Sequence, residues 1–218
     1  MTRHQLTRDE IEVAISNTAW DFANGVLYKL CEVNPDHKRD DIIIAKVWLI
    51  GRSYAAAIER RRETGGILGD KFYEECVGPG IRKEKIDDWF QAPSSAPDSN
   101  LALYLETHKK VMALFRKISG EDKPSLASKY LHFHFPSRFY IYDARAAAAI
   151  ALLTDSVAPP PGYDNVYARF FVRCEALNET IDSLLGRRLS PRDLDKVLLY
   201  EAARGKPANG ACAESPAG

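Results

Sequence analysis

The sequence predicts an all-α protein of about ten helices arranged in two lobes. Apolar residues recur at the i, i+3, i+4, i+7 spacing of a helix along most of the chain, and residues that start or stop helices punctuate them. The chain of 218 residues is also long enough to bury a sizeable core. We expect one domain over residues 1–205, with an N-terminal lobe over about 1–92, a second lobe over about 100–205 and a small, polar, disordered tail over 206–218.

Four helical stretches are expected before residue 100: from Arg8 to about 30, about 40–62, 68–77 and 81–90. Thr7 and Glu10 form a capping box, whose side chains bond to free N–H groups of the first turn. Asn24-Gly25 is a candidate break in the first stretch, and Gly78-Pro79-Gly80 is expected to end the third. Residues 91–100 are rich in proline and serine and form the one obvious loop, between the two lobes.

A tight hairpin between two helices is predicted over residues 119–123. Gly120 can adopt the left-handed conformation that ends a helix, and Pro124 suits the first position of the next one because its missing N–H is not needed there. The new helix has an apolar face and a polar arc, and Pro136 stops it. The polar arc offers hydroxyls, an amine and an imidazole: Ser125, Ser128, Lys129 and His132.

Asp143 precedes another helix, over 144–153, after a short extended run at 139–142. An aspartate in this place accepts hydrogen bonds from the first free N–H groups of the helix and lies at the positive end of its dipole. The carboxylate should therefore stay ionised at neutral pH, and it can stabilise positive charge or orient an attacking water or amine. Whether Asp143 does this or only caps the helix is open from helix chemistry alone.

Two more helices are expected after a stiff proline connector at 159–161. The first covers about 166–185, where apolar residues keep helical spacing. Ser190 caps the second, with Pro191 at its first position.

The charge of the chain is balanced, because 30 basic side chains face 30 acidic ones. This balance argues against a protein that binds nucleic acid through overall charge alone. The distribution is less even between residues 109 and 145, where eight basic residues face three acidic ones, and such a patch can steer DNA.

The four cysteines are scattered without metal-ligand spacing, so we expect reduced thiols and neither a zinc site nor another metal. His132 and His134 point to different sides of a helix, and no third ligand lies nearby in the sequence. The chain has no signal peptide and no apolar run long enough to span a bilayer, so we expect a cytoplasmic monomer without a membrane partner.

Residues 127–132 (ASKYLH), followed by residues 140–145 (YIYDAR), resemble the catalytic segment of helix-hairpin-helix DNA glycosylases. The resemblance is closest to 8-oxoguanine DNA glycosylase-like proteins of bacteria and archaea, and it covers about a third of the chain with motifs of medium specificity. It implies a cleft between two lobes, Asp143 as the catalytic carboxylate, double-stranded DNA as the partner and no cofactor. It also makes the segment from Ser190 to Leu198 the closing helix of the family.

The sequence departs from the family in two places. The family hairpin usually carries two glycines that grip a phosphate, whereas this hairpin has Gly120 and two acids. The Schiff-base lysine of the family stands where this chain has Ser125. Lys129 or Lys123 can replace that lysine as the nucleophile, or water can attack instead. These alternatives stay open in the sequence.

The resemblance suggests an enzyme that flips an oxidised purine out of duplex DNA, or a hypermodified phage base in antiviral defence, and cleaves its N-glycosidic bond. An extruded base must be held between flat and hydrogen-bonding groups, which suggests a base pocket made of Trp48 and Arg52, with Trp20 and Asn24 second. The expected DNA contacts are Gly120, Ser125, Ser128, His132, Arg138 and Arg145.

A non-catalytic helical module that binds DNA or a protein partner is the rival interpretation. The single-glycine hairpin and the zero net charge favour this rival, and the lysines near Asp143 favour the enzyme.

Overall fold

The computed structural model describes residues 4–60, 67, 69–95, 100–163 and 165–204. Among these residues the regular structure is entirely helical, which confirms the all-α prediction. In chain order the helices are α1 (Arg8–Ile15), α2 (Asp21–Val33), α3 (Asp40–Ser53), α4 (Asp70–Phe72), the π-helix η1 (Tyr73–Val77), α5 (Gly78–Lys83), α6 (Ile86–Ser95), α7 (Leu101–Ser119), α8 (Pro124–His134), α9 (Ala144–Leu153), α10 (Val166–Leu185) and α11 (Pro191–Arg204).

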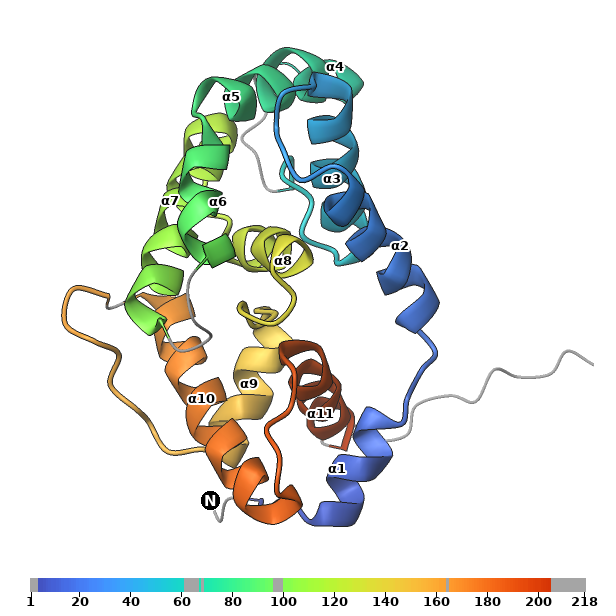
Figure 1. The fold of residues 1–218 in the computed structure, drawn as a ribbon, viewed down its shortest axis with the longest axis vertical. Coiled ribbons are helices and arrows are strands. Elements are labelled where there is room, and N and C mark those ends of the chain that lie inside the picture. Colours follow the sequence, from blue (N-terminus) through green and yellow to red (C-terminus); the bar gives the residue numbers. More distant parts are fainter. Residues whose placement is uncertain (1–3, 61–66, 68, 96–99, 164, 205–218) are drawn as a thin grey trace, which may run out of the picture.

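Helix α8 lies near the centre of the molecule (Figure 1). Helices α2 to α7 lie on one side of it, and α1, α9, α10 and α11 lie on the other. Helix α8 contacts α2, α3, α7 and α10, so it joins the two groups. Because α1 packs against α11, the first helix lies with the C-terminal helices, and a lobe made of residues 1–92 does not describe this arrangement.

Several helix starts follow the local signals in the sequence. The Thr7 hydroxyl accepts from the Glu10 N–H while the Glu10 carboxylate accepts from the Thr7 N–H, which completes the predicted capping box. The Asn165 Oδ1 accepts from the Ala168 N–H at the start of α10, and the Ser190 hydroxyl accepts from the Asp193 N–H at the start of α11.

The helix predicted over 40–62 ends early, at Ser53. Ala55 has a φ of +51°, and the Ala56 N–H donates to the Gly51 carbonyl at 2.7 Å, so the chain folds back on the end of α3. Gly51 permits this return, because a Cβ there would lie 3.1 Å from the Ala57 Cα. The apolar spacing of residues 43–58 did not reveal this reversal, because Ile58 is buried at a position that a continuing helix would also bury.

Two of the glycine segments expected to break or end helices leave no gap in the helical structure, although the predicted boundary after Val77 is observed. Helix α2 runs through Asn24-Gly25 without a break. Gly78, Pro79 and Gly80 begin α5 directly after η1. A Cβ at Gly78 would lie 3.0 Å from Asp40, and one at Gly80 would lie 3.1 Å from Ile118, so these glycines allow close packing against α3 and α7.

The loop predicted over 91–100 is partly helical, since α6 continues to Ser95 with Pro93 inside it. Residues 96–99 and the predicted tail at 206–218 lie outside the described residues. Within the described part of the chain, no helix combines the length and apolar character needed to cross a bilayer.

Candidate active site

The turn between α7 and α8 has the local geometry that Gly120 and Pro124 predict. Gly120 has a φ of +81° and donates its N–H to the Arg116 carbonyl at 2.8 Å, which ends α7. Pro124 stands at the start of α8. The use of this turn as a DNA-binding hairpin stays a prediction.

Both faces of α8 are buried, including most of its polar arc. The Ser128 hydroxyl donates to the Ser125 carbonyl at 3.0 Å and accepts from the Tyr142 N–H at 3.1 Å. His132 lies 2.8 Å from the Phe139 carbonyl through Nδ1 and 2.6 Å from the Tyr28 hydroxyl through Nε2. These two side chains hold the extended run at 139–142 against α8. The prediction that Ser128 and His132 contact DNA is therefore wrong for this structure, because neither reaches the surface.

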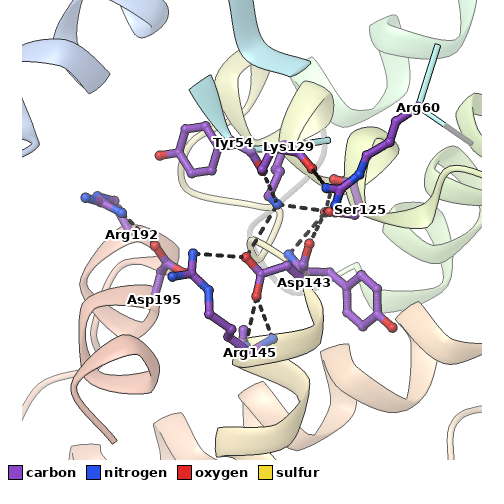
Figure 2. Close-up of polar contacts among 12 residues, drawn as sticks. Tyr54, Arg60, Ser125, Lys129, Asp143, Arg145, Arg192 and Asp195 are labelled. Atoms are coloured by element: carbon purple, nitrogen blue, oxygen red, sulfur yellow. Dashed lines mark hydrogen bonds and ion pairs between the residues drawn. The ribbon is translucent and has the colours of Figure 1, made fainter. Parts of the chain in front are cut away.

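Asp143 is placed at the N-terminus of α9 by this extended run. Its Oδ1 accepts from the N–H groups of Arg145 and Ala146, both at 2.9 Å, which confirms the predicted cap. Its Oδ2 is not used in capping and faces the Lys129 Nζ at 3.5 Å (Figure 2). Burial raises the pKa of the carboxyl, but the Ala146 N–H, Lys129 and Arg145 outweigh it and leave the pKa lowered.

Lys129 is a buried ammonium beneath Asp143, with a side chain that is 1% exposed. Its Nζ donates to the Ser125 hydroxyl at 2.9 Å and to the Tyr54 carbonyl at 3.3 Å, in addition to Asp143 (Figure 2). Three acceptors match the three N–H bonds of a protonated amine. Burial lowers the pKa of Lys129, while Asp143 and Asp195 oppose this shift.

A surface hollow of about 650 Å³ opens above this pair, which is the size expected of a small-molecule site. Three segments line it: residues 54–60, 121–129 and 142–145. Its walls therefore carry the predicted residues Ser125, Lys123 and Arg145 together with Lys129 and Asp143. The structure thus brings together the residues that the sequence placed on two different helices.

Lys123 is held away from Asp143 at the wall of the hollow. Its Nζ donates to the Arg60 carbonyl and lies 3.5 Å from the Glu121 carboxylate. Arg145 is different, because its side chain is 66% exposed and its guanidinium lies 3.9 Å from Asp143 Oδ2. Arg145 can therefore contact a ligand in the hollow without losing a buried bond.

The main pair of the predicted base pocket, Trp48 and Arg52, does not line the hollow beside Asp143. The Arg52 guanidinium does lie over the Trp48 ring, at 5.9 Å, but Trp48 lines a separate hollow of about 550 Å³ among the side chains of Asp40, Asp41, Asp70 and Glu74. Arg52 is also paired with Glu59. An acidic hollow is a poor place for nucleic acid, because the phosphates would be repelled.

Trp20 and Asn24, the second pair of the predicted base pocket, lie in different surroundings. Trp20 is 68% exposed at the end of the α1–α2 connection and lines none of the hollows described here. Asn24 is buried, and its Oδ1 accepts from the Tyr54 hydroxyl at 2.7 Å. The Asn24 side chain thus holds the hydroxyl of Tyr54, and Tyr54 lines the hollow.

Arg138 also lies elsewhere than predicted. It lines a third hollow of about 630 Å³, between the end of α8 and helices α10 and α11, with Tyr140, Glu175 and Arg188. Arg138 therefore does not line the hollow beside Asp143, and its contact with DNA stays a prediction.

Sequence reasoning missed a buried charge pair on α11. The Arg192 Nη1 lies 2.6 Å from Asp195 Oδ2, and Asp195 is 4% exposed (Figure 2). Burial raises the pKa of Asp195 to about 6, an increase that Arg192 and Lys129 oppose and Asp143 supports. The i, i+3 spacing of Arg192 and Asp195 was the available signal, but it reads equally well as a surface pair. Tyr54 and Arg60 were missed because they follow the unpredicted end of α3.

No group of three metal-binding side chains occurs among the residues that the structure describes. Cys31, Cys76 and Cys174 are free thiols, and Cys212 lies outside the described residues. Comparison of the chain with protein-family models, with curated proteins and with solved structures found no match.

Proposed function

We propose that this protein is a DNA glycosylase that acts as a cytoplasmic monomer on double-stranded DNA, extrudes a modified base and hydrolyses its N-glycosidic bond. The observation that carries the proposal is the Lys129–Asp143 pair at the wall of the 650 Å³ hollow, beside the α7–α8 turn. The pair sets an ionised carboxylate oxygen against a cavity large enough for an extruded nucleoside. The resemblance to helix-hairpin-helix glycosylases supports the same role for Asp143.

Asp143 has the properties that this reaction requires of a carboxylate. Cleavage of an N-glycosidic bond develops positive charge on the sugar, which a fixed negative charge stabilises most strongly where water is excluded. Because Oδ1 is held by two backbone N–H groups, Oδ2 has a fixed direction. That oxygen can stabilise the oxocarbenium-like sugar and accept a proton from attacking water.

Water is the nucleophile in this proposal. Lys129 uses its three N–H bonds within the protein and directs no lone pair into the hollow. Lys123 is occupied by the Arg60 carbonyl and Glu121. Lys129 is then a positioning residue that holds Asp143, and the product is an intact abasic site. Attack by either lysine would instead add an abasic-site lyase step.

The DNA-contacting surface would surround the hollow. Ser125 lies in the first turn of α8, where N–H groups without a partner inside the helix can bind a phosphate, and Gly120 shapes the turn that leads to it. Arg145 and Arg60 add positive charge at the wall, while Glu121 and Asp122 oppose it. An oxidised purine is the substrate that the resemblance suggests, and a hypermodified phage base is the alternative.

The test is base release from duplexes that carry different modified bases, read as alkali-sensitive cleavage at the abasic site. Asp143→Asn should lose at least 100-fold in release rate, since one essential charge is gone. Asparagine caps a helix as well as aspartate does, so stability and DNA binding should be kept. Asp193→Asn, which removes a charge from the first turn of α11, is the matched control and should release base normally. Equal rates for the two variants would contradict the proposal.

A non-catalytic DNA-binding or partner-binding module is the second candidate. The acidic pair Glu121 and Asp122 in the α7–α8 turn favours it, because these side chains stand where the family grips a phosphate. Duplex binding without release of any tested base, in both the wild type and Asp143→Asn, would support this candidate.

A further inference from the structure

Two arginine side chains reach the hollow beside Asp143 from different segments of the chain. Arg60 lies in the segment that follows α3, and Arg145 lies in the first turn of α9. Figure 2 shows their side chains on different sides of Asp143, and the Arg145 guanidinium is 3.9 Å from that carboxylate. Both arginines are exposed and line the same hollow, so one extended ligand can contact both of them.

Most of the hydrogen-bonding capacity of these two guanidinium groups is unused within the described part of the chain. A guanidinium has five N–H donors. Arg60 Nη1 donates to the Ala55 carbonyl at 2.7 Å, and no carboxylate of the described residues pairs with Arg60. The 3.9 Å between the Arg145 guanidinium and Asp143 Oδ2 is an ion pair, but it is too long for a hydrogen bond. Each guanidinium can therefore form a two-point contact with an anion such as phosphate.

The acidic side chains of the hollow have other cationic partners. Each of them lies 3.5 Å from a lysine or an arginine: Glu121 from Lys123, Asp122 from Arg116, and Asp143 from Lys129. The positive charges of Arg60 and Arg145 remain after these pairs are formed. Without an anion beside them, these two charges would repel the positive charge that develops on a sugar next to Asp143. A phosphate bound to each guanidinium removes this repulsion.

We propose that Arg60 and Arg145 bind the two phosphates that flank the extruded nucleotide on one DNA strand, an inference that rests on the proposed glycosylase function. One phosphate contacts Arg60 and the other contacts Arg145, so the deoxyribose between them lies against Asp143 Oδ2. The substrate is then a nucleotide inside a strand, because a free nucleoside or a terminal nucleotide lacks one or both of these phosphates.

The test replaces each flanking phosphate of the best duplex, one at a time, by a neutral methylphosphonate. The full-length wild type should bind each modified duplex about tenfold more weakly and, at saturating protein, release its base about tenfold more slowly, because each contact also positions the sugar. Arg145→Gln should show similar losses on the unmodified duplex and should be almost insensitive to one of the two methylphosphonates. Arg60→Gln should be almost insensitive to the other, since a contact already lost cannot be lost again.

Salt dependence measures the same contacts independently. The logarithm of the association constant falls with the logarithm of the salt concentration, and the slope should be smaller by about one in each variant and by about two in the double variant. Arg60→Lys should keep the wild-type slope because it keeps the charge, but it should release base more slowly because an ammonium lacks the two-point contact. Arg82→Gln is the matched control, since Arg82 is exposed and paired with Asp40 but does not line this hollow. It should bind and release as the wild type does.

Three results would contradict the inference. A methylphosphonate at either position that slows release by the wild type less than about threefold would overturn it without any variant, because each contact should contribute more than that. Losses from the arginine variants that add fully to those from both methylphosphonates would also overturn it, because groups in contact are not independent. Both results would leave the glycosylase function standing, whereas a wild type that releases no base would overturn the glycosylase function and this inference together.

Discussion

Replacing Lys129 with Gln decides whether an amine or water attacks the sugar. The ammonium lies 3.5 Å from Asp143 Oδ2, and its side chain is 1% exposed. At an effective dielectric constant of about 20, two unit charges at this distance attract with about 5 kcal/mol. Burial of an ammonium costs several kcal/mol, so the two effects nearly cancel in the free energy of unfolding. The variant should therefore stay folded.

The Lys129→Gln substitution should change the charge state of Asp143 less than the loss of an ion-pair partner suggests. Two backbone N–H bonds at 2.9 Å remain, and the Arg145 guanidinium remains at 3.9 Å. The pKa of Asp143 should rise, but the carboxylate should stay ionised at neutral pH. With water as the nucleophile, release should fall by about 10- to 100-fold, which is the cost of a misplaced group. With Lys129 as the nucleophile, release should fall by about 10⁴-fold or more.

The assay combines single-turnover release with borohydride trapping of a covalent adduct between protein and DNA. Lys46→Gln is the matched control, because Lys46 is also fully buried but lies on α3, bonded to the Asp36 carbonyl at 3.0 Å. We expect no trapped adduct in the wild type, slower release in Lys129→Gln and normal release in Lys46→Gln. An adduct in the wild type that disappears in Lys129→Gln would refute the water mechanism, and one that disappears only in Lys123→Gln would assign the attack to Lys123.

Three further predictions concern stability. Burial raises the pKa of Asp195 from 3.8 to about 6, so the folded state prefers the protonated form and loses stability as pH rises from about 4 to about 6. Because Asp195→Asn removes this loss, the melting temperature of the variant relative to the wild type should rise between pH 4 and pH 7, by the equivalent of roughly 3 kcal/mol. A difference in melting temperature that stays constant over this pH range would contradict the raised pKa of Asp195. Gly51→Ala places a Cβ 3.1 Å from the Ala57 Cα and should lower the free energy of unfolding in urea by about 1–3 kcal/mol while slowing release through the displaced Tyr54 carbonyl; Gly25→Ala, in open space on α2, is its control and should be neutral or stabilising. Gly120→Ala should cost roughly 1–2 kcal/mol because φ is +81°, and Gly120→Asn should cost less, since asparagine tolerates that conformation better; equal costs would argue against a left-handed turn in solution.

Features set by residues three or four positions apart were predictable from the sequence. The Thr7 capping box, the Gly120 turn, the start of α8 at Pro124 and the Asp143 cap all depend on such local bonds. Local bonds require no knowledge of distant segments, so the sequence determined the all-α class and the position of Asp143 at the start of a helix.

Contacts between distant segments needed the tertiary structure. The polar arc of α8 was expected at the surface, but helices on both sides cover it, and Lys129 ends against Tyr54, 75 positions earlier in the chain. Trp48 and Arg52 do stack, yet the fold places them on another hollow. Asp195 becomes an acid with a raised pKa only because α11 is packed so that its carboxyl is buried near Asp143 and Lys129. Helical periodicity states which residues share a face, and only the packing of the helices decides whether that face meets solvent, another helix or a site.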